Sequence, residues 1–166
     1  MTTVTKRKSV PARQTRRSGG SAAVVEAVPI RRYIESSALV AALLEGDKAA
    51  KASIRAMGQR ITSALTAAET SRAVLRARLS GRITAQQERA ALLTLRRFIR
   101  RCYIVSVTEE ILARAGRRFP VEPVRTLDAI HLATAEALGD PPALVAVVTR
   151  DSRVRDNANA IGHPVE

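Results

Sequence analysis

Residues 144–162 read LVAVVTRDSRVRDNANAIG, and this stretch decides the fold. The run LVAVVT has the length and unbroken apolar character of a strand buried on both faces of a parallel sheet. Asp151 follows this run, SRVRDNANAIG is predicted to form a helix, and HPV starts a last strand. A buried strand that leads directly into a helix is the repeating unit of α/β proteins.

The same alternation extends back to Arg31. Strands are predicted at RRYI (31–34), RITS (60–63) and CYIVSV (102–107). Helices are predicted at 36–46, 47–58, 64–79, 84–101, 108–119 and 126–139. Strands separated by helices require right-handed crossovers. We therefore predict an α/β fold: a three-layer α/β/α sandwich with a central parallel sheet.

Composition excludes several classes of protein. A chain of 166 residues that is 46% apolar has material for one domain with a core. The aromatic content of 2% excludes RNA-binding modules that stack bases on aromatic platforms. Cys102, the only cysteine, excludes an internal disulfide and a cysteine-rich zinc site. No apolar run reaches the roughly 18 residues of a membrane span, so a soluble protein is expected. The single cysteine fits a reducing compartment, so the expected location is the cytoplasm.

The net charge of +13 predicts a polyanionic partner, with nucleic acid as the first candidate. Residues 1–28 hold six Lys and Arg against Glu26 alone, and we predict a disordered basic tail there. An organellar transit peptide and a later translation start near Val28 are alternatives. Residues 29–166 form the predicted domain, which is basic without the tail.

Four acids lie where predicted strands end or where the following helices begin: Glu35, Glu69, Asp128 and Asp151. Ligands of open α/β sheets bind at the carboxyl ends of the strands, so these acids are expected in one cleft. Glu35, Asp128 and Asp151 have a plainer interpretation as charges at helix starts. Glu69 lies among small apolar residues on its predicted helix, where an unpaired carboxylate is costly.

Carboxylates without a His or Cys cluster are the ligand set for Mg²⁺ or Mn²⁺, held as one ion or two. Such a site in a basic protein predicts hydrolysis of phosphodiester bonds. His131 lies one turn after Asp128, and a lone helical histidine is interpreted as structural. Ser37 either orders a water in the cleft or is an ordinary first-turn serine. Arg125 and Arg150 flank the cleft and either hold substrate phosphates or form solvated surface.

Four segments together resemble the PIN-domain ribonucleases, and among them the VapC-type toxins of toxin–antitoxin modules. They are YIESSALVAALLEGD, ITSALTAAETSRAV, RTLDAIHLATAEALG and LVAVVTRDSRVRDNANAIGHPV. The resemblance covers about residues 31–166. It implies the compact α/β/α fold, RNA cleavage that depends on Mg²⁺ or Mn²⁺, and inhibition by a cognate antitoxin. The family often dimerises, so a homodimer is among the expected partners.

By motif position, the resemblance implies that Glu35, Glu69, Asp128 and Asp151 bind the metal and that Ser37 is the hydroxyl of the opening motif. Glu35 stands where the family usually has Asp. The sequence thus predicts a metal-dependent endoribonuclease, the toxin of a type II pair. One alternative is a PIN-like domain that binds RNA or protein without cutting. Another is a basic nucleic-acid-binding protein whose acids only cap helices.

Overall fold

The computed structural model describes residues 31–166, so the predicted tail at residues 1–28 lies outside the described part of the chain. The strands are β1 (Arg31–Ile34), β2 (Gln59–Ser63), β3 (Tyr103–Val105) and β4 (Val145–Val148). The α-helices are α1 (Ser36–Val40), α2 (Lys48–Arg55), α3 (Ala64–Leu79), α4 (Ala85–Ile99), α5 (Glu109–Ala115), α6 (Thr126–Glu136) and α7 (Ser152–Ile161). A π-helix, η1 (Ala41–Glu45), and a 3₁₀ turn, η2 (Pro142–Leu144), complete the set.

The strands form one sheet in the order β3-β2-β1-β4, and every neighbouring pair is parallel. β1 pairs with β2 through Tyr33 and Ile61, and with β4 through Ile34 and Val148. The chain adds strands on one side of β1 and then crosses to the other side for β4. This reversal of strand order puts the carboxyl ends of β1 and β4 side by side, at the kind of switch point where α/β proteins bind ligands.

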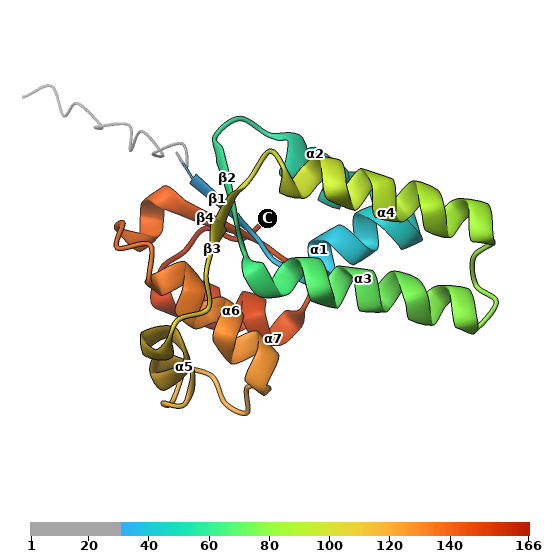
Figure 1. Cartoon of the computed structure of the whole chain (residues 1–166). Helices are drawn as coiled ribbons and strands as arrows, with labels where there is room; N and C mark the ends of the chain where they lie inside the picture. Colours follow the sequence, from blue (N-terminus) through green and yellow to red (C-terminus); the bar gives the residue numbers. More distant parts are fainter. Residues whose placement is uncertain (1–30) are drawn as a thin grey trace, which may run out of the picture.

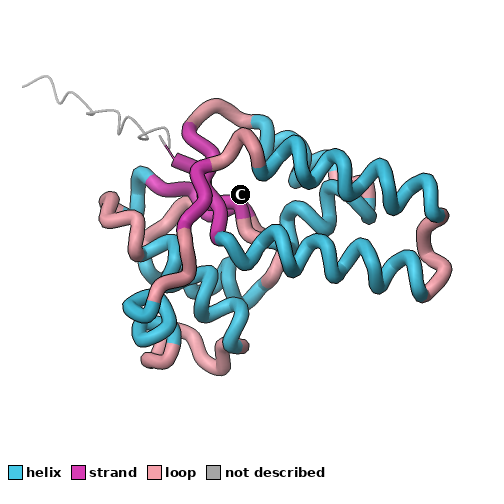
Figure 2. The backbone as a smooth tube through the Cα atoms, viewed as in Figure 1, coloured by secondary structure: helices cyan, strands magenta, loops and turns pink. Residues whose placement is uncertain are grey.

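Helices cover both faces of the sheet, which confirms the predicted three-layer arrangement (Figure 1). Successive residues of a strand point to opposite faces. Tyr33 and Val147 pack in a core with residues of α5, α6 and α7. Ile34 and Val148 pack in a second core with α1, η1, α2 and α4. Figure 2 shows the sheet between these two groups of helices, with α3 and α4 running side by side.

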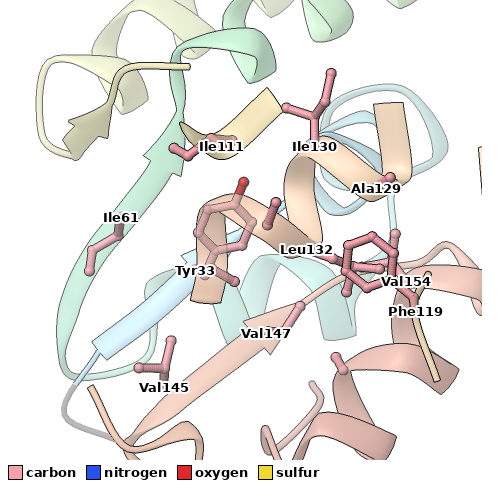
Figure 3. Packing of buried hydrophobic residues seen from close by; sticks show 13 residues of the cluster. Tyr33, Ile61, Ile111, Phe119, Ala129, Ile130, Leu132, Val145, Val147 and Val154 are labelled. Carbon is pink, nitrogen blue, oxygen red and sulfur yellow. The ribbon is translucent and has the colours of Figure 1, made fainter. Parts of the chain in front are cut away.

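The core below α6 is built from interlocking apolar side chains (Figure 3). Tyr33, Ile61 and Leu132 are at most 2% exposed and come from β1, β2 and α6. Close packing of this kind fixes the position of α6 against the carboxyl ends of the strands. The α6 side chains that lie at these strand ends are therefore held on a rigid element.

Two segments differ from the predicted elements. The single helix expected over residues 36–46 is α1 followed by the π-helix η1, whose end is closed by the amides of Gly46 and Asp47 donating to the Ala41 carbonyl. Gly46 adopts the left-handed φ of 72° that this wider turn requires. The expected strand at HPV is one parallel bridge between Val147 and Val165. No helix within residues 31–166 is long and apolar enough to cross a membrane.

We predict that Ile61→Ala lowers the free energy of unfolding by about 2–5 kcal/mol, because the variant leaves a cavity in the core of the central sheet. Urea denaturation followed by far-UV circular dichroism measures this loss. Leu112→Ala is the control, since Leu112 is 48% exposed on α5 and its truncation should change stability little. Equal losses in the two variants would contradict the assignment of Ile61 to the core.

Candidate metal site at the carboxyl end of the sheet

Glu35 occupies the first position after β1 and is 3% exposed. It is the N-cap of α1, and the Ser37 amide donates to both carboxylate oxygens at 3.0 Å. The Ser36 hydroxyl donates to Oε1 at 2.6 Å and the Thr149 hydroxyl to Oε2 at 2.9 Å. Buried charge is stable only when it is paired or hydrogen-bonded, and these donors fix the carboxylate in one orientation.

The Ser37 hydroxyl ties the turn after β1 to the turn after β4. It contacts Glu35 Oε2 and accepts hydrogen bonds from the amides of Arg150 at 2.7 Å and Asp151 at 3.1 Å. Its oxygen also lies 3.2 Å from Thr149 Oγ1. Ser37 is therefore more than a solvated first-turn serine, because it sets the relative position of two acid-bearing turns.

Glu69 and His131 meet across the site from α3 and α6. His131 Nε2 lies 2.6 Å from Glu69 Oε2, and His131 Nδ1 lies 2.8 Å from the Tyr33 hydroxyl. Burial raises the pKa of Tyr33 far above its usual value, so the hydroxyl keeps its proton and can donate to Nδ1. Nε2 then has the ring proton and donates to Glu69, an assignment made from the partners of each nitrogen. His131 thus fixes the Glu69 carboxylate.

Glu35, Glu69 and His131 form one compact cluster. Each offers a ligand atom within 4.8 Å of the other two, and His131 Nε2 lies 3.8 Å from Glu35 Oε1. Three segments distant in sequence supply these atoms: the turn after β1, the second turn of α3 and the middle of α6. The convergence of Glu35 and Glu69 matches what the sequence predicts for two of the four acids.

Asp128 stands in the first turn of α6, one turn before His131. Burial raises the pKa of Asp128, and the negative charges of Asp151 and Glu35 raise it further, while Arg125 and Arg153 act in the opposite direction. Asp128 therefore lies close enough to Asp151 and Glu35 for their negative charges to act on its carboxyl group. Within residues 31–166, its buried Oδ2 has no hydrogen-bond partner.

Asp151 is the N-cap of α7. Its Oδ1 accepts from the amides of Arg153 at 2.8 Å and Val154 at 3.3 Å. Both of these bonds end on Oδ1 and leave Oδ2 for another ligand. Capping and ligand binding are therefore compatible at Asp151, because they use different oxygens.

The two predicted arginines differ in their surroundings. Arg125 is the exposed residue that precedes α6, and its charge acts on Asp128. The Arg150 guanidinium is occupied: Nε lies 2.7 Å from Asp47 Oδ2, and Nη1 donates to the carbonyls of Thr149 and Glu166. Arg150 therefore has structural partners already, whereas Arg125 is free to meet a ligand.

His131 is the residue whose interpretation from sequence was incomplete. The sequence favours a structural histidine here, and the structure does bury it at 1% exposure, yet it lies between Tyr33 and the acid Glu69. Its spacing of three residues from Asp128 was the available signal, since i and i+3 share one side of a helix. The partner of His131 could not be predicted from the sequence, because Glu69 is 62 residues away along the chain.

Comparison with known proteins identifies the family of the chain. The chain matches the PIN domain over residues 32–160. It is 38% identical to Ribonuclease VapC46 of Mycobacterium tuberculosis over 136 residues, which cover 80% of this chain and 94% of that protein. It is 34% identical to Ribonuclease VapC35 of the same organism over 133 residues, which cover 78% of this chain and 90% of that protein.

Solved structures share the fold. The structure of Mycobacterium tuberculosis VapC20, described as a sarcin–ricin loop cleaving toxin, superposes with a TM-score of 0.56 at 17% identity, covering 80% of this chain and 95% of that one. VapBC2 of Rickettsia felis, bound to a DNA fragment from its promoter, gives 0.55 at 14% identity, covering 82% and 97%. With the family match and the two ribonuclease relatives, these likenesses show that the chain belongs to the PIN-domain family, in its VapC branch.

Proposed function

We propose that this chain is a metal-dependent endoribonuclease that hydrolyses RNA phosphodiester bonds in the cytoplasm, as the toxin of a type II toxin–antitoxin pair. Its relatives VapC46 and VapC35 are ribonucleases, and its membership of the VapC branch implies a cognate antitoxin as partner. The observation that supports the proposal most directly is the meeting of the Glu35 and Glu69 carboxylates. Asp128, on which the charges of Glu35 and Asp151 act, adds a buried Oδ2 that has no hydrogen-bond partner within residues 31–166.

The donor set fits a hard divalent cation. Glu35, Glu69, Asp128 and Asp151 offer carboxylate oxygens, which Mg²⁺ and Mn²⁺ prefer. His131 is nearby, but its Nε2 proton is directed at Glu69, so it is a positioning residue in this proposal. A buried carboxylate oxygen without a partner is costly, and a cation would stabilise Asp128 Oδ2. We propose that these four acids hold one or two Mg²⁺ or Mn²⁺ ions.

When bound, such an ion lowers the pKa of a water molecule and offsets charge on the scissile phosphate. The chain's own residues supply geometry. Ser37 fixes the turns that bear Glu35 and Asp151, and His131 fixes Glu69. Arg125 places a positive charge at the rim beside Asp128, where it can hold a substrate phosphate.

A PIN-like domain that binds RNA without cutting is the rival candidate. The observation that favours it is the saturation of Glu35, whose oxygens accept from Ser36, Ser37 and Thr149. The rival predicts that the natural chain shows no metal-dependent turnover of RNA. Cleavage of RNA by the natural chain in Mg²⁺ or Mn²⁺ therefore distinguishes the two functions, and variants of Asp128 and Glu35 test which acids that cleavage needs.

Asp128→Asn should abolish cleavage of labelled RNA in Mg²⁺ or Mn²⁺, because it removes a ligand charge from the site. In metal-free buffer the variant should be at least as stable as the natural chain, since the repulsion from Asp151 and Glu35 is relieved. Cleavage is measured on a gel and stability by thermal unfolding. Asp156→Asn, an exposed acid on α7, should cut normally. Full activity in Asp128→Asn would refute the metal site.

The role of Glu35 can be tested by changing the length of its side chain as well as its charge. Glu35→Ala should abolish cleavage, whereas Glu35→Asp should keep or increase it, because Asp is the family's usual residue there and also caps helices well. Initial cleavage rates of the two variants, compared at matched folded fractions, decide the matter. Wild-type rates in both variants would mean that Glu35 only caps α1.

Changes at His131 should alter the concentration of metal ion that cleavage requires. His131→Leu removes the donor to Glu69, so the Mn²⁺ concentration for half-maximal cleavage should rise about 10–100-fold, and His131→Gln should recover part of the loss. His163→Leu is the control: His163 is also buried, and its ring lies within hydrogen-bond distance of the Val145 carbonyl through Nδ1. That variant should lose stability without a change in metal requirement. An unchanged requirement in His131→Leu would leave His131 with a packing role alone.

A further inference from the structure

Helices α3 and α4 form a hairpin that projects from the sheet (Figure 1). We call residues 64–101, which comprise this hairpin and its end, the arginine arm. The arm contains nine arginines, all exposed, against the two acids Glu69 and Glu88. Within residues 31–166, only Arg78 of these arginines has a carboxylate within 4.0 Å, namely Glu88 at 3.8 Å. The arm therefore has a large positive charge that the described protein does not neutralise.

Two arginines of the arm continue a row of side chains on α3 that begins at Glu69, one of the proposed metal ligands. Arg72 and Arg76 follow Glu69 at i+3 and i+7, positions that share one side of a helix. Seven residues of helix advance about 10 Å, so this row leads away from the carboxylates along α3. Glu69 thus ends a row of side chains whose other members are cationic.

The row continues onto α4. Arg72 and Arg96 line one groove of about 360 Å³ between the two helices, whose other lining residues are Ser71, Leu75, Glu88, Leu92 and Leu95. Glu88 is the acid in this groove, and Arg78 offsets its charge. The groove therefore has an apolar floor of leucines with an arginine on each helix.

We propose that Arg72, Arg76 and Arg96 form a track that binds the phosphate backbone of single-stranded RNA beyond the scissile bond. The proposal rests on the endoribonuclease function proposed above and adds where the substrate lies. Arginine suits phosphate oxygens, because its planar guanidinium donates in pairs and keeps its charge at any physiological pH. An acidic protein segment offers similar charge, but the alignment of the track with the catalytic carboxylates favours the molecule that is cut there.

Binding of fluorescent polyuridylate and of tetrauridylate, measured over a range of salt concentrations without divalent ions, tests the track. The full chain should bind polyuridylate more tightly. Arg72→Gln/Arg76→Gln/Arg96→Gln should lower that affinity at least 10-fold and reduce the log–log salt slope by about 2, since each lost contact to a single strand removes about 0.7. Its binding of tetrauridylate should change little.

The matched control is Arg55→Gln/Arg97→Gln/Arg101→Gln. These three arginines line a different groove, beside Arg60 at the start of β2 and so at the sheet edge opposite the carboxylates. The control removes the same charge and should keep the polyuridylate affinity and slope near those of the natural chain. Equal losses in both triple variants would overturn the track, because binding would then follow net charge alone.

Two further measurements are decisive. Polyglutamate that binds the arm as tightly as polyuridylate, and loses affinity with the track variant, would make the arm a protein-binding surface and overturn the proposal. Cleavage of polyuridylate and of total bacterial RNA in Mn²⁺ is measured separately. Track-dependent binding in a natural chain that never cuts would support the track while refuting the nuclease. Cutting without track-dependent binding would refute only the track.

Discussion

Repulsion between carboxylates crowded at one edge of the sheet is the constraint on which the rest of the structure depends. Glu35, Asp128 and Asp151 interact electrostatically, and Glu69 lies beside Glu35. Like charges this close destabilise a fold unless other groups compensate them. The chain uses helix N-termini for Glu35 and Asp151, and a histidine donor for Glu69. Asp128 alone keeps a buried oxygen without a partner, so the compensation within the described protein is incomplete at one atom. That incompleteness is what a cation would complete.

The strand order explains why these compensating groups are available. Because β4 joins the sheet beside β1, the turns after β1 and β4 are neighbours, and the Ser37 hydroxyl can accept from amides of the second turn while contacting the acid of the first. α6 is fixed by its packing on the sheet, and it carries His131 to Glu69 and Asp128 into the field of Glu35 and Asp151. The cluster is therefore a consequence of the crossover topology. Moving any one of these elements would separate the acids.

The fold was predictable from sequence because the strands and helices have strong local patterns. The predicted strand LVAVVT contains β4, Val145–Val148, whose four residues are all buried, and α3 begins and ends at the predicted residues 64 and 79. The convergence of Glu35 and Glu69 could be predicted, because Glu35 follows a strand and Glu69 lies among small apolar residues on the helix after the next strand. Their partners could not, since Tyr33–His131–Glu69 joins three distant segments through side-chain orientations that no local pattern contains. The π-helix η1 was missed for a related reason: AALLEG has ordinary helical periodicity, and the wider turn is visible only in the hydrogen bonds to the Ala41 carbonyl.

Helix capping and metal binding are usually weighed as alternatives for an acid after a strand, yet in the proposed site they would cooperate. At Asp151 the cap uses Oδ1 and leaves Oδ2, so the amides of α7 would orient the oxygen that is left for a ligand. At Glu35 the Ser37 amide contacts both oxygens, and the extra methylene lets the side chain bend back over its own helix. Glu35 Oε1 accepts from Ser36 and Ser37, and Oε2 accepts from Ser37 and Thr149, so a cation would compete with these donors for the oxygen lone pairs. The same donors also lower the electron density that Glu35 can offer. In the proposed site Glu35 would therefore be a well-oriented but weaker ligand, and the affinity for metal should depend most on Asp128, the acid with the fewest donors.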